Sequence, residues 1–300
     1  MSFLFLFLSR PQSILLLLLL LLLLCFSLFP LPNPFFCGAH RPDPLIRTAK
    51  ATTTAALLPS DAIVANAMVG PRSWIVGLFN RSGNKKNDKF LQYPLSPLQE
   101  ERLQRLQDRM HIPFDETCID HREALRALWN AAYPDIELKG MISEQWKEMG
   151  WQGPNPSTDF RGCGFISLEN LLFFSRTFPA SFRRLLLKED GNRATWEYPF
   201  AVAGINVSFM LIQMLDLKSE KPRCLPGLNF LRLLGENEEA FDVLYCVAFE
   251  MMDAQWLAMH ASYMEFNEVL QVTRTQLERE LSLEDIHRIQ DLPAYNLLHQ

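Results

Sequence analysis

The sequence lacks the short motifs that mark most metal and enzyme sites. Its six cysteines and six histidines form no Cys-X-X-Cys pair and no His-Glu-X-X-His motif, and no other spacing of these residues suits zinc. The glycine-centred motifs of serine hydrolases and of nucleotide-binding enzymes are absent as well. We therefore expect no bound metal, no cofactor and no ordinary constellation of catalytic residues.

The excess of positive charge that nucleic-acid-binding proteins need is also missing. The 29 lysines and arginines are outnumbered by 34 acidic residues, so the net charge is -5. Residues 1–60 hold four basic groups and one acid, which leaves a charge of -8 on the remainder. An acidic body argues against binding to nucleic acid, but it does not argue against a protein partner.

Patterns typical of disulfide frameworks and of β-strands are absent too. The cysteines are scattered, as in proteins of reducing compartments, and Cys246 lies in an apolar helical pattern that predicts a small buried side chain. Asn80 and Asn206 begin glycosylation sequons that we interpret as chance, since Asn206 lies in a strongly apolar run. No segment alternates for long enough to be a strand, so we predict an all-α fold.

What the sequence does have is a very hydrophobic N-terminus. Residues 14–24 are unbroken leucine apart from Ile14, and the apolar run extends over residues 14–29. Its 16 residues fall between a signal-peptide core of about 7–15 residues and a membrane span of about 17–25. More positive charge follows the run than precedes it, which favours an anchor with the remaining chain in the cytoplasm. A cleaved signal or transit peptide is the alternative, because residues 48–60 are rich in Thr and Ala.

We divide the chain into three parts. Residues 1–30 are the hydrophobic segment, residues 31–95 are a Pro-rich, polar and mostly irregular linker, and residues 96–300 are one helical domain. Ser96, Pro97 and Gln99 have the pattern of a helix start, with an N-cap serine, a proline at the first position and a glutamine at the third. The inward face of that first helix is predicted to hold Leu98, Leu103, Leu106 and Met110.

Further helices are predicted from apolar residues at three- and four-residue spacing. The most apolar of them, over residues 199–217, is expected to be a buried central helix rather than a second membrane span. The last large pattern, over residues 238–280 and including His260, indicates one long helix or two helices in line. The others are expected at residues 121–133, 143–149, 167–176 and 180–188, with a short helix beginning at Ser282.

The segment at residues 146–164 has the most unusual composition. It reads WKEMGWQGPNPSTDFRGCG and contains two tryptophans, four glycines, two prolines and Arg161. Such a density of Gly and Pro predicts a rigid irregular loop that can hold one side chain toward a partner. A guanidinium held in this way is suited to neutralising the charge of a phosphate.

Two interpretations of Asp159, Phe160 and Arg161 remain open from the residues alone. In the structural one, Asp159 caps the following turn, Phe160 fills the core and Arg161 pairs with a nearby acid. In the functional one, Asp159 or a neighbour orients Arg161 toward GTP bound to another protein, where it offsets charge between the β- and γ-phosphates. Cys163 is either a nucleophile or a small residue in a tight turn, and the absence of an evident His partner favours the turn.

The same segment resembles the signature of the ELMO (engulfment and cell motility) domain, and the similarity covers roughly residues 96–297. The short, plant-type ELMO-domain proteins are the most similar, and families of this kind include GTPase-activating proteins for Arf-family small GTPases. The resemblance places their essential arginine on Arg161. The residues expected to shape the loop around it are Trp146, Gly150, Trp151, Gln152, Gly153, Pro156, Thr158, Asp159, Phe160 and Gly162.

The resemblance implies a partner rather than a substrate. The partner would be a small GTPase of the Arf family carrying its own GTP and Mg²⁺. The hydrophobic N-terminus is not part of the family pattern, but residues 14–29 would hold the chain at the membrane where it activates this partner. The alternative is a non-catalytic adaptor that binds a small GTPase or scaffolds an exchange factor. The armadillo repeats and pleckstrin-homology domain of the larger ELMO scaffolds do not fit in this chain, so their role with DOCK exchange factors is not implied. A third hypothesis is that the chain is a secreted or lumenal helical protein.

Overall fold

The computed structural model describes residues 94–188, 191, 193 and 197–300, and all the regular elements among them are helices. The all-α prediction is therefore confirmed for this part of the chain. The hydrophobic segment at residues 1–30, the linker up to residue 93 and the sequon at Asn80 lie outside the described residues. Within the described residues, no helix combines the length and the apolar character needed to cross a membrane.

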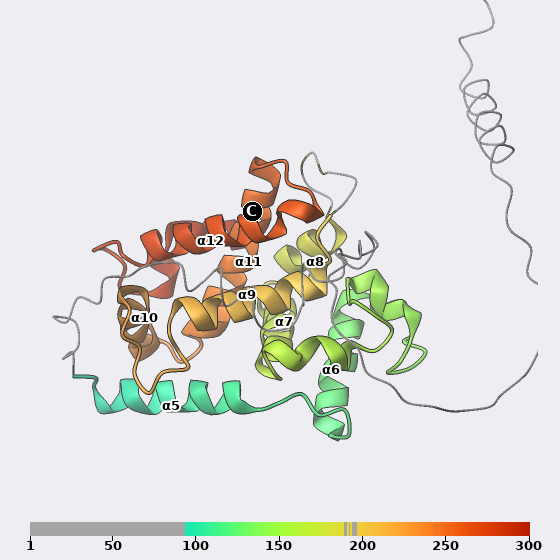
Figure 1. Ribbon diagram of the computed structural model, residues 1–300, viewed down its shortest axis with the longest axis horizontal. Coiled ribbons are helices and arrows are strands. Elements are labelled where there is room, and N and C mark those ends of the chain that lie inside the picture. Colours follow the sequence, from blue (N-terminus) through green and yellow to red (C-terminus); the bar gives the residue numbers. More distant parts are fainter. Residues whose placement is uncertain (1–93, 189–190, 192, 194–196) are drawn as a thin grey trace, which may run out of the picture. The chain divides into compact units, whose positions relative to one another are not determined.

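The described part contains eight α-helices and five short 3-10 helices. Their arrangement is shown in Figure 1. The α-helices are α5 (Pro97–His111), α6 (Ile119–Ala132), α7 (Ile166–Thr177), α8 (Pro179–Leu187), α9 (Phe200–Met214), α10 (Leu225–Glu236), α11 (Ala240–Ala258) and α12 (Phe266–Glu280). The 3-10 helices are η2 (Glu144–Met149), η3 (Pro156–Gly162), η4 (Tyr263–Glu265), η5 (Ile289–Asp291) and η6 (Pro293–His299).

The start of α5 confirms the pattern at Ser96. The Ser96 hydroxyl accepts a hydrogen bond from the Gln99 amide at 3.2 Å, and the Gln99 side chain accepts one from the Ser96 amide at 2.9 Å. Leu103 and Leu106 are buried as predicted, but the inward position predicted for Leu98 is wrong, since 45% of this residue is exposed. Five residues rotate a helix by about 140° beyond a full turn, so Leu98 and Leu103 lie on different faces.

The central helix is α9, which confirms the prediction of a buried helix over residues 199–217. Nearly all of its residues are buried, and it packs against α7, α11 and α12 (Figure 1). Asn206 is only 7% exposed, and its side-chain amide donates to the Val202 carbonyl at 2.8 Å. A glycan could not fit there, in agreement with the interpretation of this sequon as chance.

The prediction of one long helix or two in line over residues 238–280 is wrong. The chain turns between α11 and α12, and the two helices pack against each other. His260 has a φ of 48° and lies in that turn, where the amides of His260 and Ala261 bond to the Leu257 and Trp256 carbonyls. A residue in the left-handed conformation ends a helix. Because the apolar spacing of the sequence continues across this turn, the pattern did not reveal where α11 ends.

The helix expected to begin at Ser282 is not formed. Residues 281–288 are turns and bends, and the next helical elements are the short η5 and η6. The helix start lies further along the chain, where Asp291 is the third residue of η5. Its carboxylate accepts hydrogen bonds from the amides of His287 and Arg288 at 3.2 and 2.8 Å, as in a capping box.

A buried polar network holds the end of α5 against the core. Arg109 binds both carboxylate oxygens of Asp242 on α11, at 2.7 and 3.0 Å, and also reaches Glu169 on α7. Asn170 donates to the same Asp242 carboxylate and accepts from Ser208 on α9. Removing one partner of a buried ion pair leaves the other charge uncompensated and destabilises the fold. The network therefore sets where the chain leaves α5.

Candidate functional site

The segment at residues 146–164 is more regular than the predicted irregular loop. The helix expected at residues 143–149 has the predicted ends, with Ser143 as N-cap and Gly150 after it, but it is the 3-10 helix η2. A second 3-10 helix, η3, begins after the N-cap Asn155 and carries Arg161 in its last turn. The hydrogen-bonded turn of η3 therefore fixes the backbone at Arg161.

A chain of aromatic rings anchors this segment in the core. The ring of Trp151 packs edge-on against those of Trp146 and Phe160, with centroids 6.3 and 5.1 Å apart. Phe160 in turn stacks on Phe114, and both Trp146 and Phe160 are almost fully buried. Contacts of this geometry add to the stabilisation from burial. Phe160 fills the core as the structural interpretation predicted, and it fixes the backbone next to Arg161.

Asp159 does not cap the following turn, although the structural interpretation predicted that it would. Its buried carboxylate accepts hydrogen bonds from the Gln152 amide at 3.0 Å and from the Thr158 hydroxyl at 3.3 Å. It thus ties η3 back to the preceding loop and holds the backbone next to Arg161, to which it does not hydrogen-bond. Burial raises the pKa of Asp159, although the Gln152 and Thr158 hydrogen bonds and the charge of Arg161 oppose that shift.

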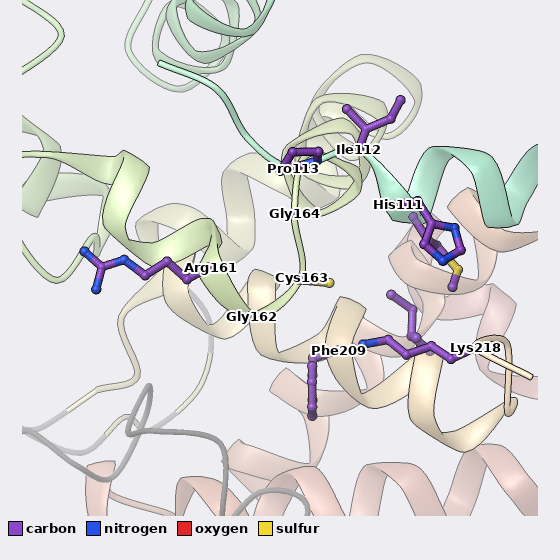
Figure 2. A pocket seen from close by; sticks show the side chains of 11 residues that line it. His111, Ile112, Pro113, Arg161, Gly162, Cys163, Gly164, Phe209 and Lys218 are labelled. Atoms are coloured by element: carbon purple, nitrogen blue, oxygen red, sulfur yellow. The ribbon is translucent and has the colours of Figure 1, made fainter. Parts of the chain in front are cut away.

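Arg161 is exposed, and among the described residues it does not form the ion pair with a nearby acid that the structural interpretation predicted. No hydrogen bond or ion pair joins its guanidinium to another side chain in the part of the chain that the structure describes. Figure 2 shows its side chain extending away from His111 and Lys218. A guanidinium without an internal partner keeps all its donors for a ligand or a second protein.

Only two of the four glycines in the segment are required by the backbone. Gly150 has a φ of 86°, and a Cβ there would lie 2.4 Å from the Phe200 amide nitrogen. Gly164 has a φ of 77°, and a Cβ there would lie 2.6 Å from the Ile112 carbonyl oxygen. Gly153 and Gly162 have open space around them instead. The rigidity predicted from four glycines therefore depends on Gly150 and Gly164, where the segment meets its neighbours.

The predicted loop-shaping residues lie together, at different depths. Gly150, Gly153 and Thr158 are partly buried, and Gln152 and Gly162 are exposed. The fully buried members are Trp146, Trp151, Pro156, Asp159 and Phe160. Arg161 and Gly162 are therefore exposed residues on a buried support.

Arg161 stands between two clefts. The first, which we call the α5–α9 cleft, is lined by residues 110–113, residues 161–164, Phe209, Ile212 and Lys218 (Figure 2). The second, which we call the acidic cleft, is lined by residues 113–117, Ser157, Thr158 and Arg161. The sequence did not point to the α5–α9 cleft, because its walls come from segments up to about a hundred residues apart.

Cys163 is a buried small residue, as the turn interpretation predicted. Only 8% of it is exposed, and burial raises the pKa of its thiol to about 12. At neutral pH such a thiol is almost entirely protonated and a poor nucleophile. No group of three or more His, Cys, Asp or Glu side chains that could hold a metal occurs among the described residues.

We expect Cys163 to resist alkylation in the folded protein. At pH 8 its reaction with iodoacetamide should be slower than that of partly exposed Cys118 by more than about 100-fold, because little thiolate is present and access is blocked. Peptide mass spectrometry of the full chain after timed labelling measures both rates, and the difference should disappear in denaturant. Equal rates in the native protein would contradict the burial and reopen the nucleophile interpretation.

Comparison with known proteins gives consistent matches. The ELMO/CED-12 family matches residues 104–270, which include the whole site. ELMO domain-containing protein A of Dictyostelium discoideum is 31% identical over 191 residues, which cover 57% of this chain and 19% of that protein. ELMO domain-containing protein B of the same organism is 30% identical over 184 residues, 61% of each chain. ELMO domain-containing protein 2 of Homo sapiens is 33% identical over 159 residues, 52% of this chain and 51% of that protein. The matched part thus spans between about a fifth and three fifths of these relatives.

Proposed function

Because the chain belongs to the ELMO/CED-12 family, we propose that it accelerates GTP hydrolysis by an Arf-family small GTPase and supplies Arg161 in trans. One observation carries the proposal: Arg161 is exposed on a well-supported turn and forms no ion pair with the described residues. The likeness of residues 146–162 to the signature of ELMO-domain GTPase activators supports the choice of GTPase.

The proposed chemistry needs little from this chain beyond one positioned cation. During hydrolysis, negative charge shifts toward the oxygen that bridges the β- and γ-phosphates, and a planar guanidinium can stabilise it with two donors. The GTPase supplies its own Mg²⁺ and positions its own water, so no general base is required here. An arginine supplied in this way accelerates hydrolysis by about 10³–10⁵-fold.

The support of Arg161 explains how one side chain could act in this way. Phe160 and Asp159, its neighbours in η3, are both buried and held by the contacts described above. The backbone at Arg161 is therefore placed before a partner arrives, and only the side chain has to be ordered on binding. Preorganisation of this kind lowers the entropic cost of reaching the transition state.

Single-turnover hydrolysis distinguishes this proposal from the adaptor alternative. The full chain is mixed with a panel of GTP-loaded Arf-family GTPases, and phosphate release is followed together with binding. We expect at least one GTPase to be accelerated by about 10³-fold or more. Binding without any acceleration across the panel would reject the activator and leave an adaptor that holds a GTPase.

The membrane anchor at residues 14–29 is part of this proposal. Its basis is the sequence alone, since these residues lie outside the described part of the chain. We expect the full chain to remain in the membrane fraction after alkaline extraction, with residues 96–300 accessible to protease from the cytosolic side. Deleting residues 1–30 should release it, and protease protection of the helical domain would contradict a cytosolic orientation.

A further inference from the structure

The α5–α9 cleft lies directly beside Arg161 but differs from a nucleotide pocket. Its volume of about 240 Å³ is below the roughly 300–1,000 Å³ of pockets that enclose small molecules. Its floor is apolar, with Ile212 buried and Phe209 partly buried on α9. At its edge the Ile112 residue is 41% exposed. A space of this size suits one or two side chains of another protein.

The charge around this cleft has one sign. None of its eleven lining residues is acidic, whereas Arg161, Lys218 and His111 are all basic and exposed. No ion pair joins Lys218 to a carboxylate among the described residues, and its ammonium lies 5.9 Å from the centre of the Phe209 ring. The acidic cleft, on the other side of Arg161, contains Asp115 and Glu116. An acidic partner surface is therefore attracted to the α5–α9 side.

The direction of the Arg161 side chain separates docking of the partner from charge stabilisation at its phosphates. Its side chain extends away from the α5–α9 cleft, while the ammonium of Lys218 lies over the cleft beside Phe209 (Figure 2). A partner seated in the cleft would thus meet Lys218 and Ile112, and its neighbouring surface would face the guanidinium. The backbone offers little obstruction there, because a Cβ on Gly162 would meet no atom within 4 Å.

We infer that the α5–α9 cleft binds an acidic side chain and an adjacent apolar side chain on the surface of the GTP-bound GTPase, next to its nucleotide. This inference rests on the proposed function and adds the surface that positions the partner. Lys218 attracts the carboxylate, Ile112 contacts the apolar side chain, and Arg161 is left to face the phosphates. Docking and charge stabilisation are then carried by different residues.

Two substitutions in the cleft test this division of tasks. Lys218→Glu reverses the charge at the edge, and Ile112→Asp places a charge on the apolar contact. Each should raise the concentration for half-maximal GTPase stimulation by about tenfold or more. The hydrolysis rate at saturation should stay within about twofold of wild type, because Arg161 is intact. Lys218→Glu should also reduce the salt dependence of association.

Matched controls come from elsewhere on the surface. Lys139 and Ile142 are exposed and line neither cleft, so Lys139→Glu and Ile142→Asp make the same chemical changes away from the proposed contact. The measurements use the full chain with the panel of GTP-loaded Arf-family GTPases, and binding is recorded with a non-hydrolysable GTP analogue. Thermal unfolding of each variant separates lost docking from lost folding.

The outcomes separate this inference from the proposed function. If wild type accelerates a GTPase but both cleft variants behave like their controls, the inference is wrong and the proposed function stands. If wild type binds without acceleration and the cleft variants weaken binding, the cleft is a docking surface of an adaptor. If wild type neither binds nor accelerates any GTPase of the panel, both are rejected. A lower saturating rate with unchanged half-maximal concentration would also overturn the inference.

Discussion

Arg161→Lys is expected to remove at least about 10³-fold of the GTPase acceleration while leaving binding of the GTP-loaded partner nearly unchanged. Lysine keeps the positive charge but presents a single ammonium in place of two coplanar donors. Because Arg161 is exposed and forms no ion pair with the described residues, the substitution should change the free energy of unfolding by less than about 0.5 kcal/mol. The loss should therefore appear in the saturating rate and not in stability.

The matched control is Arg126→Lys, at an exposed position on α6 that lines neither cleft. This variant should stimulate GTP hydrolysis by the partner to the same rate as wild type. Single-turnover phosphate release at saturating activator, with urea unfolding of the same samples, measures both effects. If Arg161→Ala keeps the acceleration within tenfold of wild type, Arg161 is not the group that stabilises the transition state. If Arg161→Ala lowers the free energy of unfolding by several kcal/mol, Arg161 is neither exposed nor unpaired in solution.

Gly150→Ala is expected to destabilise the fold by about 3 kcal/mol or more. A Cβ would lie 2.4 Å from the Phe200 amide nitrogen and 2.7 Å from the Pro199 carbonyl carbon, and neither backbone atom can swing aside. The φ of 86° adds strain of about 1–3 kcal/mol for a residue with a side chain. Overpacking adds a cost of similar size. The loss should be visible as a lower urea midpoint in circular dichroism.

Gly153→Ala and Gly162→Ala serve as controls in the same segment. A Cβ at either position meets no atom within 4 Å, and neither glycine has a positive φ. Their free energies of unfolding should equal that of wild type or exceed it by up to about 1 kcal/mol, because alanine restricts the unfolded chain. If Gly150→Ala unfolds at the same urea concentration as these two variants, the close approach of residue 150 to the start of α9 is not present in solution.

Local features of this protein follow from the sequence because they depend on residues a few positions apart. The capping box at Ser96 and Gln99, the end of η2 at Gly150 and the burial of α9 all follow from spacing, turn chemistry and hydrophobicity. The errors also have local causes. The apolar spacing of α11 and α12 continues through the turn at His260, and the pattern around Ser282 does not reveal that Asp291 is the capping acid.

The sequence by itself determined that the described part is helical, that α9 is buried and that Arg161 lies within a family signature. Only the tertiary structure decided that Arg161 has no internal acidic partner, that Gly150 meets the start of α9, and that Ile112, Phe209 and Lys218 share a cleft with it. The physical reason is the range of the interactions. Hydrogen bonding and hydrophobic periodicity act within a turn or a helix, whereas ion pairing, steric contact and cleft shape depend on which distant segments the packed core brings together.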